Sequence, residues 1–180
     1  VDDSVVQASL KRFTWLLVNL GTAILASLVI GLFDGTLEEM VALAILMPIV
    51  ASMGGNAGTQ TLTITVRALA TKELTGYNAF RTFRKEFAVG LVNGVVFALL
   101  AGLVVVLWFN QLDDRYLLGG IIAGAMIINM VVAGIAGVLL PLALDRIGID
   151  PAVASGVFVT TVTDVIGFFA FLGLAAAILI

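Results

Sequence analysis

Five long apolar windows, separated by short polar links, run along the chain. They cover residues 13–33, 40–66, 87–112, 116–144 and 151–180, and Asp164 alone interrupts the last of them. A transmembrane helix needs about 20 mostly apolar residues, and each window reaches that length. The pattern predicts an all-α integral membrane protein with five transmembrane helices in residues 13–180. Residues 1–12 are expected to be a cytoplasmic connecting segment truncated from a longer chain.

Composition narrows the possible chemistry. The chain is 61% apolar and only 12% charged, against roughly 45–50% and about 25% in soluble domains, so an ordinary soluble domain is excluded. Cysteine and histidine are both absent from the 180 residues, which rules out thiolate and imidazole ligands. Any bound metal must therefore be held by oxygen. The net charge of −3 gives no support for nucleic-acid binding.

The basic residues give the chain a direction across the membrane. Eight of the nine Lys and Arg residues fall on one side of the predicted spans, and only Arg115 falls on the other. Cytoplasmic loops carry an excess of Lys and Arg. With an odd number of spans the termini lie on opposite sides, so we expect a multi-pass protein of the cell (inner) membrane with a cytoplasmic N-terminus.

Asp164 is a polar residue that lipid alone does not explain. It follows the start of the fifth window by about 20 Å of helix, which is near the bilayer midplane. An Asp there costs about 2.5–3.5 kcal/mol, and intramembrane acids usually mark ion pathways. Either the acid is protonated and hydrogen-bonded inside the bundle, or it lies beside water or a cation; its neighbours favour the second reading. Thr160, Thr161 and Gly167 share its broad helical face.

The second window carries the densest polar stretch. The residues expected on one helical face are Ser52, Asn56, Thr59, Gln60 and Thr63. In hydrocarbon each polar group needs an internal partner, so this face should look into the bundle or into a water-filled pore. Bonds that merely hold helices together are the alternative. Single mid-span amides, Asn19, Asn93 and Asn129, are expected to make such bonds, and Asp150 is expected to cap the helix that starts at Pro151.

A carboxylate, hydroxyls and an amide form a hard, all-oxygen site that suits Mg²⁺, Ca²⁺ or Mn²⁺. One Asp cannot balance a dication, so we expect two chains to pair about a central pore, each contributing Asp164. Few direct ligands also fit Mg²⁺, which dehydrates reluctantly and keeps several waters. No acid pair, activated nucleophile or phosphate-binding loop is recognisable in the sequence, so we do not expect an enzyme.

Two motifs carry a family resemblance. The stretch from Pro48 to Gln60, with the pattern Pro-x5-Gly-Gly-Asn-x-Gly-x-Gln, and Asp150-Pro151-Ala152 followed by the segment from Thr160 to Gly167, resemble the MgtE family of magnesium channels. The resemblance implies a homodimer whose second and fifth spans line the pore. It also implies that Asp164 is the pore carboxylate, that the Thr160 carbonyl is its companion ligand, and that Asp150 helps bind ions at the cytoplasmic mouth.

Members of this family usually carry a cytoplasmic acidic domain and paired CBS modules that close the pore when internal magnesium is high. This stretch of sequence contains neither, so magnesium-sensing closure is not expected of it. The leading interpretation is a passive channel for Mg²⁺, with Mn²⁺, Co²⁺ or Ca²⁺ as other possible ions. A Na⁺- or H⁺-coupled divalent cation exchanger and a non-conducting membrane anchor are the alternatives.

Overall fold

The computed structural model describes residues 4–74 and 78–179, apart from the side chains of residues 8 and 11. Within these residues the chain is helical and has no strand. The helices are α1 (Val5–Gly31), α2 (Asp34–Glu39), α3 (Val41–Ala70), α4 (Ala79–Trp108), α5 (Arg115–Arg146) and α6 (Pro151–Leu179). Five of them are long and apolar enough to cross a membrane, which confirms the predicted number of spans.

The helices do not end where the hydropathy changes. α1 begins at Val5, inside the predicted connecting segment, because the Ser4 hydroxyl accepts the Gln7 amide proton at 3.3 Å and caps the helix there. α4 begins at Ala79 and runs without a break through basic residues into the apolar window that starts at residue 87. The acidic link after the first span forms the short helix α2.

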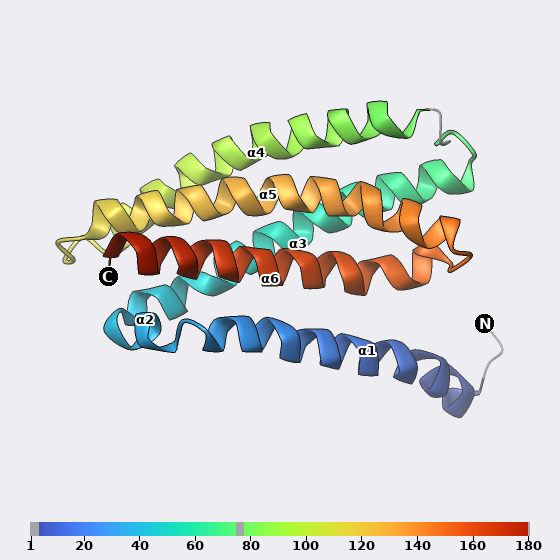
Figure 1. The fold of residues 1–180 in the computed structure, drawn as a ribbon, viewed down its shortest axis with the longest axis horizontal. Helices are drawn as coiled ribbons and strands as arrows, with labels where there is room; N and C mark the ends of the chain where they lie inside the picture. The colour runs from blue at the N-terminus through green and yellow to red at the C-terminus, as the bar shows by residue number, and fades with distance from the viewer. Residues whose placement is uncertain (1–3, 75–77, 180) are drawn as a thin grey trace.

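α5 is the centre of the bundle. Figure 1 shows the long helices side by side, with α5 between α4 and α6, α3 crossing behind them, and α1 at the edge next to α6. The core where α3, α5 and α6 meet includes Leu43, Leu46, Val50, Leu118, Ile122, Phe171 and Leu172, all with no exposed surface. α1 begins and α6 ends at opposite ends of the bundle (Figure 1), as an odd number of spans requires.

Glycines let α4 lie against α5. A Cβ atom added at Gly90 would lie 2.8 Å from the Met130 carbonyl oxygen, and one at Gly94 would lie 3.2 Å from the Ile127 Cα atom. The small-residue spacing of Gly90 and Gly94 therefore does permit close packing, as expected from such patterns. Gly120, in the corresponding pattern of α5, has nothing within 4 Å of the same added atom.

α1 is the least buried of the spans. Only 6% of its most apolar 18 residues are buried inside the chain, against 56% for α5. It packs mainly on α6, and apolar side chains such as Leu17, Leu25 and Leu28 remain exposed. A face of this kind is suited to lipid or to another protein surface.

Candidate functional site

Asp164 lies one residue from the midpoint of α6, which runs from Pro151 to Leu179. Its side chain is half-buried. Among the side chains that the structure describes, none forms a hydrogen bond or an ion pair with it. A carboxylate at this depth is costly unless a proton or a cation neutralises it, and no described residue of the single chain supplies a positive charge to it.

The threonine hydroxyls beside Asp164 keep free lone pairs on their oxygens. The Thr160 hydroxyl donates to the carbonyl oxygens of Gly156 and Val157, both at 3.0 Å, and the Thr161 hydroxyl donates to the Val157 carbonyl at 2.6 Å. A hydroxyl that donates its only proton to its own helix still has free acceptor capacity. These two oxygens can therefore accept hydrogen bonds from the water molecules around a cation.

The Thr160 carbonyl oxygen is already engaged. The buried Thr163 hydroxyl donates to it at 2.9 Å, and α6 is continuous here, so the Asp164 amide donates to it as well. Both acceptor positions of a carbonyl are then filled. The oxygen can contact a cation directly only if the Thr163 hydroxyl rotates to another partner.

α3 has a polar face that no other part of the described chain buries. Ser52, Asn56, Thr59 and Thr63, spaced four, three and four residues apart, are exposed, whereas Gly54, Gly58, Thr61 and Thr65 on the opposite face are buried. Along the exposed face the Asn56 amide donates to the Ser52 hydroxyl at 3.4 Å. The Thr59 and Thr63 hydroxyls donate back to carbonyls of their own helix, each at 2.8 Å. In a membrane this exposed face needs water or a protein partner.

Contacts with Asn129 of α5 show which residues of α3 and α6 lie at the same level along the bundle. A Cβ atom added at Gly54 would collide with the Asn129 amide nitrogen, and one at Gly167 would lie 2.6 Å from it, so both glycines pack on the same side chain. One turn further along α3, Gly58 faces Val159 of α6. The two helices are thus antiparallel, and the turn of α3 that carries Asn56 lies at the depth of Asp164.

The structure also confirms the interhelical bond expected of Asn129. Its amide nitrogen donates to the Val50 carbonyl of α3 at 2.9 Å. Its amide oxygen is buried and has no hydrogen-bond partner. Asn129 therefore connects the central helix to α3 at the level of the site but leaves one polar atom unsatisfied.

A groove brings part of the two polar faces together. It has a volume of about 760 Å³, and Thr59 of α3 and Thr160 of α6 both line it. α1 forms its other wall through Arg12, Trp15 and Asn19. Asn19 was expected to bond to another helix, but within the described residues its side chain makes no hydrogen bond. Asn19 is therefore a polar residue beside the candidate site rather than one that holds two helices together.

Three candidate residues lie away from this face. Gln60 lines a different cavity, between α3, α4 and α5, and Gly167 is buried against Asn129 rather than exposed on the polar side of α6. Asp150 is exposed and accepts the Ala152 amide proton at 2.9 Å, which makes it the expected cap of α6. About 20 Å of helix separates it from Asp164.

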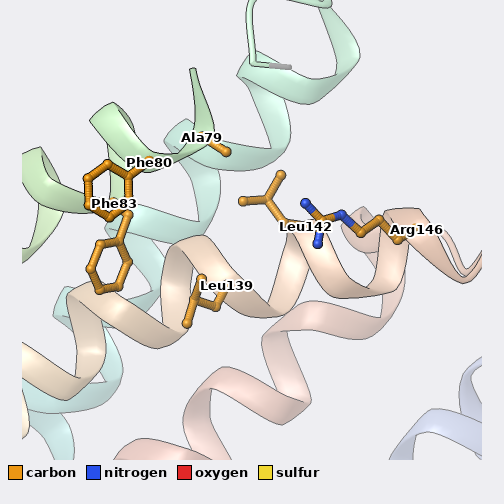
Figure 2. A pocket seen from close by; sticks show the side chains of 6 residues that line it. All are labelled: Ala79, Phe80, Phe83, Leu139, Leu142 and Arg146. Atoms are coloured by element: carbon orange, nitrogen blue, oxygen red, sulfur yellow. The ribbon is translucent and has the colours of Figure 1, made fainter. Parts of the chain in front are cut away.

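A separate apolar pocket has no cation-binding chemistry. It occupies about 420 Å³ between the start of α4 and the end of α5, and its lining consists of Ala79, Phe80, Phe83, Leu139, Leu142 and Arg146. Figure 2 shows the two phenylalanine rings on α4, across from the α5 side chains. The only charged residue of this lining is basic, so the pocket does not extend the candidate cation site.

Five membrane-length helices around a half-buried mid-span carboxylate are typical of integral membrane ion transporters. Residues 47–174 match the family model of MgtE, described as a divalent cation transporter, and the chain belongs to this family. The family is one of transporters and not of enzymes.

Three relatives bear the name magnesium transporter MgtE. The chain is 30% identical to the protein of Bacillus subtilis and 35% identical to that of Enterococcus faecalis, in each case over 98% of its own length. It is 35% identical to the protein of Thermus thermophilus over 94% of its length. The matches cover only 37–38% of each relative, so the chain spans well under half the length of these proteins.

Proposed function

We propose that this chain forms the membrane pathway of a magnesium transporter, in which a hydrated Mg²⁺ passes Asp164 on its way into the cytoplasm. The observation that carries the proposal is the unpaired, half-buried carboxylate at the depth of the exposed polar face of α3. Membership of the MgtE family and the names of the relatives support the choice of ion.

The pathway lies between two copies of the chain. A single Asp164 neutralises only half the charge of a divalent ion, whereas a symmetric pair supplies two carboxylates. The pair also accounts for the uncovered face of α3, because Ser52, Asn56, Thr59 and Thr63 then line an aqueous path rather than contact lipid. The N-terminus is cytoplasmic in this arrangement, since most basic residues lie at that end of the helices.

The ion keeps most of its water at this site. Mg²⁺ dehydrates reluctantly and is usually held by one or two carboxylates and several waters. The free lone pairs of Thr160 and Thr161 accept hydrogen bonds from those waters, while Asp164 provides the charge. Asp150 lies at the mouth of the path. Mn²⁺, Co²⁺ and Ca²⁺ are chemically acceptable to the same oxygen donors, and transport is passive, down the electrochemical gradient.

Flux into proteoliposomes tests this function. Asp164→Asn keeps the shape of the side chain but removes its charge, and we expect Mg²⁺ uptake to fall by about tenfold or more, equivalent to about 1.4 kcal/mol in the barrier. Asp113→Asn, a change at an exposed acid in the link between α4 and α5, is the matched control and should leave uptake unchanged.

The same assay separates a channel from a coupled exchanger. Uptake that persists when Na⁺ and pH gradients are both removed supports the passive path, whereas uptake that stops identifies an exchanger. If Asp164→Asn is folded and takes up Mg²⁺ as well as the unchanged protein does, Asp164 does not hold the transported ion and the proposed pathway is wrong.

A further inference from the structure

A second acid is buried in the bundle, away from the polar faces of the proposed pathway. Glu86 lies two turns into α4, and only 5% of it is exposed. It accepts a hydrogen bond at 3.2 Å from the Thr61 hydroxyl of α3. Thr61 is on the buried face of α3, opposite the face that carries Asn56. The proposed passage of Mg²⁺ past Asp164 makes no use of this group.

No positive charge neutralises Glu86 within the described part of the chain. It forms no ion pair there, and the adjacent basic residues Arg84 and Lys85 are exposed. The residues of other helices that line the cavity beside it are neutral, and they include Gln60 and Thr61 of α3 and Met130 and Gly134 of α5. A buried charge without a partner is strongly unfavourable. Glu86 therefore requires a cation or a proton.

A cavity beside Glu86 has room for such a ligand. Its volume is about 80 Å³, which exceeds the minimum of about 10–15 Å³ that a single water needs. Four polar residues line it: Thr61 and Glu86, which are buried, and Gln60 and Asn93, which are exposed at its outer side. The amide oxygens of Gln60 and Asn93, if turned into the cavity, would join the Thr61 hydroxyl and the Glu86 carboxylate in a hard donor set, which suits alkali and alkaline-earth cations rather than soft metals.

We propose that Glu86, together with Gln60, Thr61 and Asn93, binds a monovalent cation of the size of Na⁺ in the cavity between α3, α4 and α5. The charge decides the valence. One carboxylate and one monovalent cation form a neutral complex, whereas a divalent ion would leave a net positive charge in a region of low dielectric constant. A water or two complete the coordination in the remaining space.

This site is independent of the magnesium path. It uses the buried side of α3 and the first turns of α4, whereas Asp164 lies on α6. Cation binding there ties the cytoplasmic ends of α3 and α4 together at a point where Thr61 and Glu86 provide the hydrogen bond between these helices. If the proposed sodium site does not exist, the proposed role of Asp164 is unaffected.

Binding of ²²Na⁺ to the purified protein, measured by scintillation proximity in choline buffer without Mg²⁺, tests the proposal. The unchanged protein should show saturable binding, and Glu86→Gln should weaken it by about tenfold or more. Thr61→Val, which removes one hydroxyl at nearly constant volume, should weaken it several-fold. Glu73→Gln, a change at an exposed acid in the link after α3, should bind as the unchanged protein does.

Each other outcome overturns the site. If the unchanged protein shows no saturable ²²Na⁺ binding, no cation site exists at Glu86. If Glu86→Gln remains monodisperse and binds normally, the cation lies elsewhere. Should Glu86→Gln fail to fold, unaltered binding by folded Thr61→Val contradicts the proposal on its own.

Discussion

At the scale of single residues, the site depends on which polar atoms remain free after the helices form. The hydroxyls of Thr160 and Thr161 donate to their own helix and keep lone pairs, whereas Asp164 keeps both of its oxygens free in the described structure. Asn129 sits in a notch made by two glycines, Gly54 and Gly167, that leave room for its amide. The small size of Gly54 and Gly167 is therefore as important for the site as the polarity of its threonine and aspartate side chains.

Gly54→Ala tests the notch. The added methyl group would collide with the Asn129 amide, and overpacking of this kind typically costs about 1–3 kcal/mol. We expect a lower midpoint of thermal unfolding in detergent. Gly21→Ala, at an exposed position of α1 with nothing within 4 Å, is the control and should be neutral or slightly stabilising, because alanine favours helix.

The partner side chain can be checked in the same assay. Combining Gly54→Ala with Asn129→Ala removes the group that the methyl would strike, so the double variant should lose less stability than the two single losses added together. Strict additivity would show that the two positions do not interact.

At the scale of elements, α5 holds the bundle together through close backbone contacts. α4 approaches it at Gly90 and Gly94, and the same face of α4 carries Glu86 one turn earlier. The residues 86, 90 and 94 recur every four positions, which places them on one side of a helix. The position of Glu86 in the interior thus follows from the same packing that brings α4 onto α5.

Gly90→Ala should loosen this contact. Its new methyl group would lie 2.8 Å from the Met130 carbonyl oxygen, and a backbone atom cannot move aside as a flexible side chain can. We expect a loss of about 1–3 kcal/mol, measured as a shift of the unfolding midpoint. Gly120→Ala has open space around it, and an equal loss at that position would refute the packing explanation.

At the scale of the whole molecule, the chain leaves a polar face and an unpaired acid that a single copy does not complete. The proposed pair of chains brings the Asn56 faces together around the ion. Because the sequence contains no cysteine, a single introduced thiol reports on one position without interference.

Asn56→Cys tests the pairing directly. In membranes treated with a short bifunctional maleimide, we expect a covalent dimer on gel electrophoresis, because the two copies of this position face each other across the path. Leu99→Cys, on the exposed side of α4, should remain monomeric under the same treatment. Efficient dimer formation at Leu99 but not at Asn56 would place the interface on α4 instead of α3 and would contradict the proposed pairing.

The apolar windows predicted the five spans because length and hydropathy are sufficient for a membrane helix. They missed the early starts of α1 and α4, because backbone hydrogen bonds continue through polar residues such as those before Phe87. Glu86 was overlooked because it follows Lys85 in a basic link, although its spacing from Gly90 and Gly94 is a signal for a buried position. Thr59 and Gln60 line different cavities. This difference depends on which helices pack on each side of α3, and the residue pattern of α3 alone does not contain that information.

In the proposed pair of chains, a divalent ion lies between two copies of Asp164. A structure of the protein in a lipid or detergent environment with bound Mn²⁺ tests it most directly, since Mn²⁺ takes the same oxygen ligands and gives an anomalous signal. We expect one anomalous peak on the symmetry axis, beside both carboxylates and near Thr160. Two Asp164 side chains that point apart into dry packing, with no peak between them, would contradict it.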